Sequence, residues 1–224
     1  MNTGAFDNLI RLLPEFQKAL WETFVMVGIS GCVAVPLGGL LGVWLFTGAE
    51  GQIFARPGLN RTVSRLVSFM RAFPFVILMI VLMPFTRLIV GTSFGSSAAS
   101  VSLSIAGTFY FARLVEQNLS EVPKGVIEAA QAMGAKPMTI VFKVLINEAR
   151  AGLILSVTIL IIALLGESAA AGTIGGGGIG YLGIRYGHQR YMKDVMAAVV
   201  SLLSVIVILV QSMGNRLSKH LDKR

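Results

Sequence analysis

The stretch EAAQAMGAKPMTIVFKVLINEA, residues Glu128–Ala149, mixes charged, small and apolar residues in a chain that is otherwise strongly apolar. The 224 residues are 54% hydrophobic and 13% charged, with a mean hydropathy of +0.76. Soluble domains carry about 25% charged residues. The composition therefore predicts an all-α integral membrane protein, and the length suits a single transmembrane domain over residues 1–224.

Five stretches reach the roughly 20 mainly apolar residues that a membrane-spanning helix needs. They cover residues 21–46, 66–90, 98–119, 151–171 and 192–213. Proline and glycine inside such spans are tolerated where neighbouring helices satisfy the freed backbone groups. In the first span, small residues predict close approach of a second helix; these are Gly28, Gly31, Gly38, Gly39 and Gly42. Before the first span, we expect an amphipathic segment rather than a cleaved signal, because leucines recur at helical spacing among scattered charges.

Residues 120–150, between the third and fourth spans, have the pattern of a pair of helices. Pro123 suits the first turn of a helix and Gly134 a left-handed helix end. Pro137 predicts a second short helix, and Asn147 suits the N-cap of the fourth span. Two capped helices with small residues between them favour docking against a partner protein over a solvated linker. The docking residues would be Glu128, Ala129, Ala130, Met133 and Gly134.

The distribution of basic residues predicts the orientation, since cytoplasmic loops are enriched in Lys and Arg. With five spans, 13 of the 19 basic residues fall on one side; these are Arg56, Arg61, Arg65, Arg71, Arg113, Lys124, Lys136, Lys143, Arg150, Arg216, Lys219, Lys223 and Arg224. The remaining six fall on the other side. We therefore expect the 120–150 loop and the C-terminus in the cytoplasm, and the N-terminus on the outer side of the membrane. Basic residues are not clustered on a soluble face, which argues against nucleic-acid binding.

No metal or catalytic constellation is visible in the sequence. Cys32 is the single cysteine, and His188 and His220 stand apart without ligand spacing. Ser168 has no identifiable His or Asp partner for nucleophilic chemistry. The GxGxxG pattern at 178–183 follows a membrane helix rather than a strand, which argues against dinucleotide binding. The chain also lacks a GxxxxGK[ST] phosphate-binding loop, so we expect no cofactor in this chain and no enzymatic activity of its own.

Glu167 is the only acidic residue deep inside a predicted span. A carboxylate at the bilayer centre costs about 2.5–3.5 kcal/mol on insertion scales, so it should face the bundle interior or water. Two interpretations remain open: a pair with an Arg or a backbone group, or a place along a substrate pathway with its neighbours Ser168 and Ala170. The glycine run that follows is either an outer hinge or a close-packed loop near the pathway mouth; it includes Gly175, Gly176, Gly177 and Gly178.

The docking residues also carry a resemblance to a known family. Glu128-Ala129-Ala130, then Gly134, then Val144 and Ile146 after nine and eleven intervening residues, resemble the EAA loop of ABC importer permeases. Asn147 stands where that motif usually has Pro. Further stretches resemble the permeases of methionine importers; they are residues 71–75, 84–87, 90–93, 133–138 and 175–187. That family commonly has Tyr at the position of Glu167 and Met at that of Ala170.

The resemblance covers about residues 21–213 and implies a complete transport system. It implies five spans per subunit, a homodimer of permeases, two cytoplasmic ATPase subunits that bind ATP and Mg²⁺, and a periplasmic or lipid-anchored binding protein. The substrate would be D- or L-methionine or a related small amino acid, crossing a bacterial inner membrane. The EAA helix would seat in a groove of the ATPase. The alternative is an ATP-independent secondary transporter or channel, which would not need the EAA element.

Overall fold

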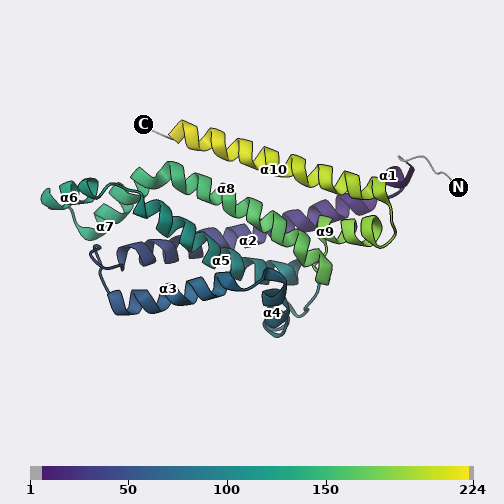
Figure 1. Cartoon of the computed structure of the whole chain (residues 1–224), viewed down its shortest axis with the longest axis horizontal. Coiled ribbons are helices and arrows are strands. Elements are labelled where there is room, and N and C mark those ends of the chain that lie inside the picture. Colours follow the sequence, from purple (N-terminus) through teal and green to yellow (C-terminus); the bar gives the residue numbers. More distant parts are fainter. Residues whose placement is uncertain (1–6, 222–224) are drawn as a thin grey trace. The chain divides into compact units, whose positions relative to one another are not determined.

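The computed structural model describes residues 7–221, and all regular structure in that part of the chain is helical (Figure 1). The α-helices are α1 (Asp7–Arg11), α2 (Leu13–Thr47), α3 (Pro57–Ala72), α4 (Phe75–Val90), α5 (Ser96–Ser120), α6 (Lys124–Ala132), α7 (Pro137–Thr139), α8 (Ile146–Ala171), α9 (Gly178–Leu182) and α10 (Lys193–Leu221). Two π-helical turns, η1 (Ile140–Leu145) and η3 (Gly183–His188), and one 3₁₀ turn, η2 (Gly172–Ile174), complete the set. The predicted all-α class is confirmed.

Four helical segments in the described residues are long and apolar enough to cross a membrane alone. They are Leu13–Thr47, Ser96–Ser120, Pro137–Ile174 and Lys193–Leu221. The first three contain the expected spans at 21–46, 98–119 and 151–171. The fourth covers the expected span at 192–213 except for its first residue and continues eight residues beyond its end. A fifth crossing exists only if α3 and α4 together form one broken span.

The expected second span, 66–90, is not a single helix but is broken at Phe73–Pro74. Pro74 has φ −58° and ψ 129°, outside the helical region. A proline also disfavours helical geometry in the residue before it and removes one backbone donor, which ends α3 and lets α4 start afresh. Pro36 and Pro84, in contrast, stay inside helices α2 and α4.

The chain packs as two compact units, with boundaries inside α2, α5, α8 and α10 and between α3 and α4. Unit 1 consists of residues 1–33, 73–106 and 161–210, and unit 2 of residues 34–72, 107–160 and 211–224. Each unit has its own apolar core, drawn from segments far apart in the sequence.

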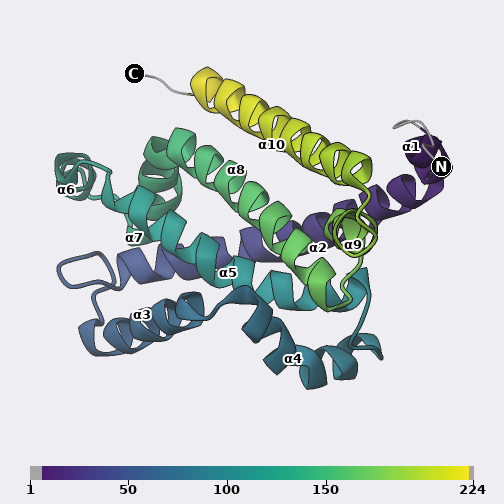
Figure 2. The same cartoon turned by 45° about the vertical axis from the view of Figure 1, so that its right-hand side comes forward.

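In unit 1, the first turns of α2 pack against α9, η3 and the start of α10, which lie side by side in Figure 2. The buried members of this core are Ala19, Ile179, Leu182, Tyr186, Val195 and Val199. Leu9, Leu12 and Phe16 pack against them, so the amphipathic segment before the first span does pack on the bundle. Leu13, another leucine of this segment, is instead 55% exposed.

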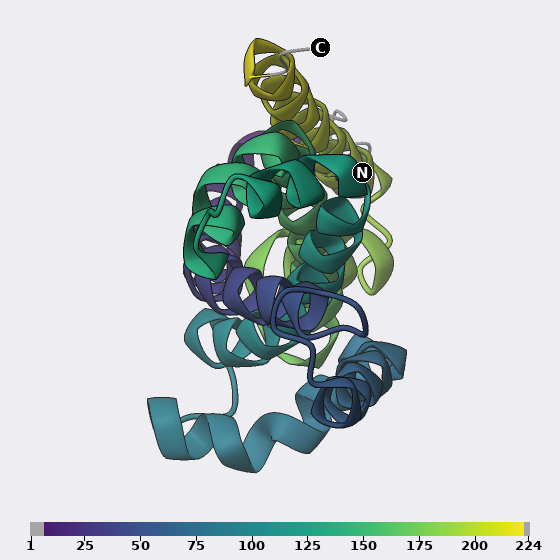
Figure 3. The same ribbon diagram turned by 90° about the vertical axis from the view of Figure 1, so that its left-hand side faces the viewer.

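In unit 2, the second half of α2 packs against α3 and α5 around Leu45, Val67 and Ala112. Figure 3 turns toward the viewer the end of the molecule at which α6 and α7 lie. Gly38 and Gly42 let α2 approach α5, because a Cβ on Gly42 would lie 2.5 Å from the Ala112 carbonyl oxygen and one on Gly38 2.6 Å from that of Thr108. The predicted small-residue contact is thus confirmed for these two glycines.

The same prediction is wrong for Gly28 and Gly31 within this chain, because nothing lies within 4 Å of a Cβ added to either. A Cβ added to Gly39 would lie 3.7 Å from Phe111, an ordinary van der Waals distance, so this position does not require glycine for close approach.

The α2–α5 contact gives a matched test. Gly42→Ala should destabilise the folded chain by about 1–3 kcal/mol, the usual cost of overpacking, since its methyl group meets backbone that cannot rotate away. Gly28→Ala is the control, because the same added methyl group meets open space. Thermal unfolding of both variants in detergent measures the difference. An equal or higher midpoint for Gly42→Ala would contradict the close approach of α2 and α5.

Candidate functional site

Helix α6 ends in the left-handed turn that the sequence predicts at Gly134. Gly134 has φ +73°. Its N–H donates to the Gln131 carbonyl at 2.9 Å, and the Ala135 N–H donates to that of Ala130 at 3.1 Å. These two bonds are the pair that defines a Schellman cap, and they satisfy carbonyls at the end of the helix. Pro123 lies one position earlier than expected, at the N-cap rather than in the first turn.

The exposed face of α6 carries most, but not all, of the expected docking residues. Glu128, Ala129 and Gly134 are exposed, and Met133 is 81% exposed. Ala130 is only 4% exposed and points inward beside Ile127. The expectation that Ala130 forms part of the docking surface is therefore wrong, because Ala130 is buried together with Ile127 on the packed side of α6. We call the exposed residues Glu128, Ala129, Met133 and Gly134 the docking surface.

Helices α6 and α7 form a helical hairpin, and its second arm, α7, is continuous with the following span. Pro137 starts α7 at the predicted place, in the first helical position. The π turn η1 then runs into α8 without a break, since Ile146 has φ −65° and ψ −37° and donates its N–H to the Val141 carbonyl. Asn147 therefore lies inside the helix. The prediction that Asn147 caps the start of the fourth span is wrong. The wider π turn keeps the backbone hydrogen-bonded through this region.

The start of α8 is also fastened to the end of α10. The Arg150 Nε donates to the Leu221 carbonyl at 2.9 Å, and the Ser218 Oγ donates to the Ala151 carbonyl at 3.0 Å. Both bonds lie within unit 2. They fix the start of α8, which continues from the second arm of the hairpin, against the end of α10.

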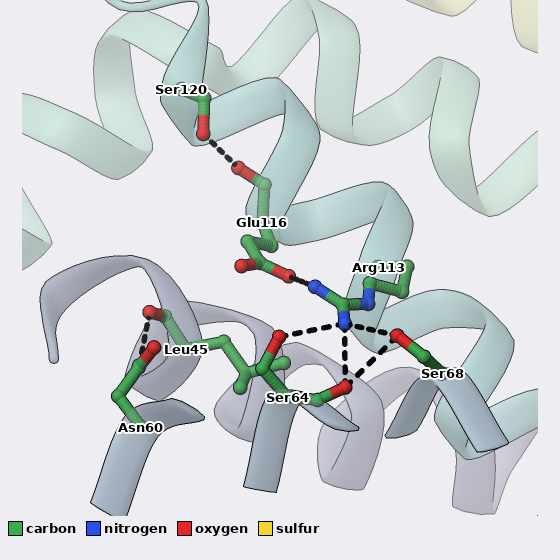
Figure 4. Close-up of polar contacts among 7 residues, drawn as sticks. All are labelled: Leu45, Asn60, Ser64, Ser68, Arg113, Glu116 and Ser120. Carbon is green, nitrogen blue, oxygen red and sulfur yellow. Dashed lines mark hydrogen bonds and ion pairs between the residues drawn. The ribbon is translucent and has the colours of Figure 1, made fainter. Parts of the chain in front are cut away.

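A polar cluster around Arg113 joins α3 to α5 in unit 2 (Figure 4). The sequence analysis did not predict this Arg113 cluster. The Arg113 guanidinium donates to Glu116 at 2.6 Å, to the Ser64 carbonyl at 2.6 Å and hydroxyl at 2.8 Å, and to the Ser68 hydroxyl at 2.6 Å. Arg113 and Glu116 side chains are each 21% exposed. Charge-assisted bonds to a guanidinium are roughly twice as strong as neutral ones, so Arg113 fixes the polar helix α3.

Glu167 lies half-buried near the end of α8. Among the described residues, no hydrogen bond or ion pair engages its carboxylate. The first of the two interpretations, a pair with an Arg or a backbone group, therefore has no partner within this part of the chain. Ala170 is partly exposed. Ser168 is 1% exposed, and its hydroxyl donates to the Leu165 carbonyl of the same helix at 2.8 Å.

The glycine run 175–178 is a closely held turn in unit 1. Gly175, Gly177 and Gly178 all have positive φ, between +78° and +88°. The Glu22 carboxylate accepts the Gly178 N–H at 2.7 Å, and the Thr23 hydroxyl accepts the Ile179 N–H at 2.9 Å. Of the two interpretations of this run, the geometry favours the close-packed loop over a flexible hinge.

Glu22 and Thr23 could not be found by local sequence reasoning. Each lies 156 residues from its hydrogen-bond partner, and nothing in their neighbourhood marks them except polarity at the start of an apolar run. The GxGxxG pattern that begins at Gly178 lies in helical backbone, α9 and the start of η3, without a preceding strand. In residues 7–221, no group of three or more His, Cys, Asp or Glu side chains is placed to hold a metal ion.

Comparisons with known proteins show which proteins this chain resembles over nearly its whole length. The chain is 45% identical to a probable D-methionine transport system permease protein of Vibrio cholerae, over 92% of each chain. It is 42% identical to the methionine import system permease protein of Bacillus subtilis, over 95% of this chain and 96% of the relative. A chain of the MetNI methionine ABC transporter in an inward-facing conformation matches with a TM-score of 0.93 and 43% identity, covering 95% of this chain and 99% of that one.

A chain of an amino acid ABC transporter shares the fold, with a TM-score of 0.79 at 17% identity. A family model described as binding-protein-dependent transport system inner membrane component matches residues 34–224. That range contains the docking surface, Glu167 and the glycine run. The chain therefore belongs to this family: it is an ABC transporter permease, the inner membrane component of a binding-protein-dependent transport system.

Proposed function

We propose that two copies of this chain form the translocation pathway of an ATP-driven importer for methionine, D or L, or a related small amino acid. Two cytoplasmic ATPase subunits bind ATP and Mg²⁺ and drive the cycle, and an external binding protein delivers the substrate. The observation that carries this proposal is the 43% identity and 0.93 TM-score to a chain of a methionine ABC transporter over nearly the whole length.

The docking surface supports the division of labour between permease and ATPase. Helix α6 and the turn that follows it expose the uncharged residues Ala129, Met133 and Gly134 beside the acidic Glu128. The Gly134 cap is rigid, and the second arm of the hairpin is continuous with α8. Both features suit an element that transmits a movement of the ATPase to the spans. The alternative, an ATP-independent secondary transporter or channel, has no use for such an element. Co-purification of an ATPase with the chain decides between them.

The cap at Gly134 gives the first test of this proposal. Gly134→Val forces a β-branched side chain into left-handed backbone, which costs about 1–2 kcal/mol, and adds bulk at the docking surface. We expect normal insertion but loss of ATPase association, or loss of substrate-stimulated ATP hydrolysis. Gly125→Val is the control, since Gly125 lies in the same helix without positive φ and with open space around it. Unchanged coupling in Gly134→Val would count against docking through α6.

Glu167 gives a test of the pathway. Because no cation among the described residues pairs with it, Glu167→Gln should assemble and melt like the parent chain. If its carboxylate contacts substrate, methionine uptake should fall roughly tenfold, the worth of one charge-assisted hydrogen bond. Glu167→Tyr, the residue common in methionine permeases, should be tolerated. Ser168→Ala is the control, because that hydroxyl is buried. Poor assembly with normal uptake per assembled complex would instead assign Glu167 a structural role.

The orientation of the two termini depends on whether α3 and α4 together cross the membrane once. We propose five crossings, with the N-terminus periplasmic and the C-terminus cytoplasmic. A reporter fused after Arg224 should then read cytoplasmic, and one fused before Met1 periplasmic. Both reporters on one side would mean an even number of crossings, which is the result expected if α3 and α4 enter and leave the same face.

A further inference from the structure

A cavity of about 280 Å³ in unit 1 lies beside the first turns of α2, the glycine turn and the α9–η3 segment. Its charged lining residues are Glu15, Lys18, Glu22 and Arg185, and its aromatic ones are Tyr181 and Tyr186. Two carboxylates and two cations around one small space suit a ligand that itself carries both charges.

The Arg185 guanidinium is the side chain in this cavity that most needs a partner. It stacks on the rings of Tyr181 and Tyr186, with its central carbon 5.6 and 5.5 Å from the ring centres. Among the described residues, neither a hydrogen bond nor an ion pair engages its N–H groups. A half-buried guanidinium held by two rings, with its donors free, is arranged to bind phosphate or carboxylate through two parallel bonds.

The carboxylates retain acceptor capacity on the other side of the cavity. One oxygen of Glu22 accepts the Gly178 N–H, but the other lies 3.9 Å from the Lys18 ammonium, too far for a hydrogen bond. Glu15 makes no ion pair within the described residues. An ammonium group with N–H donors can therefore be bound between Glu15 and Glu22 while an anionic group reaches Arg185.

The sequence around the cavity places it at the level of the lipid head groups. Glu22 is the last charged residue of α2 before an apolar run that continues to Glu50. Trp21 and Phe24, stacked with ring centres 5.9 Å apart, are 66% and 69% exposed on the same turns of the helix. Exposed aromatic residues at the end of an apolar run mark the membrane–water interface.

We propose that this cavity binds the head group of a zwitterionic phospholipid with a primary ammonium, phosphatidylethanolamine. The phosphate accepts hydrogen bonds from Arg185, and the ammonium donates to Glu15 and Glu22. Phosphatidylglycerol offers the phosphate without the ammonium, and the quaternary ammonium of phosphatidylcholine has no N–H to donate. A free amino acid has the same pair of charges, but a cavity at head-group level that opens beside exposed aromatic residues favours the lipid.

The test uses the assembled permease–ATPase complex in nanodiscs of equal parts phosphatidylethanolamine and phosphatidylglycerol with identical acyl chains. After transfer to mild detergent, the lipid retained per complex is measured by mass spectrometry. We expect the parent complex to retain phosphatidylethanolamine preferentially, and Arg185→Gln to lose roughly tenfold in affinity for it. Glu15→Gln, at an exposed site of α2, should weaken the same preference without disturbing the glycine turn.

Arg190→Gln is the matched control. Arg190 also stacks on Tyr186, 4.8 Å from the ring centre, but does not line the cavity. It should retain phosphatidylethanolamine like the parent. Equal retention of phosphatidylglycerol by the parent complex, or equal losses in Arg185→Gln and Arg190→Gln, would overturn the proposal. Displacement of the lipid by millimolar L-methionine or L-alanine would overturn the lipid assignment in favour of a solute.

Discussion

Backbone N–H and C=O groups at the end of a helix lack their helical partners, and inside a membrane the replacement must come from the protein, because hydrocarbon offers none. The described chain meets this constraint with side chains at the glycine turn, where Glu22 and Thr23 accept the N–H groups of Gly178 and Ile179. At the Gly134 cap, the N–H groups of Gly134 and Ala135 donate to carbonyls of α6. At the break between α3 and α4, the N-cap residue Pro74 has no N–H that needs a partner. The positions of the helix ends follow from these solutions.

Polar side chains also decide which helices are held firmly within each unit. In unit 2, the Arg113 cluster fastens α3 to α5, and Arg150 and Ser218 fasten the start of α8 to the end of α10. The docking surface on α6 is thus attached to a base with fixed geometry. A partner that displaces α6 would meet a structure that transmits force, since close-packed interiors deform little.

The sequence by itself determined the helical class, the positions of four long apolar helices, the cap at Gly134 and the helix start at Pro137. Each of these has a local cause. The long helices follow from apolar runs of spanning length, the cap from the absence of a Cβ in Gly134, and the helix start from the ring of Pro137, which fixes φ. The motif around Glu128 also sufficed for the family, because its spacing is local.

Only the tertiary structure decided the remaining features, since they depend on which distant segments meet. Local periodicity could not tell that Ala130 packs inward while Met133 is exposed, or that a π turn carries the helix past Asn147. It could not distinguish Gly42, whose missing Cβ admits the backbone of α5, from Gly28, which faces open space. Nor could it pair Glu22 with Gly178 across 156 residues. For Gly42 and for Glu22 the deciding atom belongs to another helix, so the information lies in the packing rather than in the neighbouring sequence.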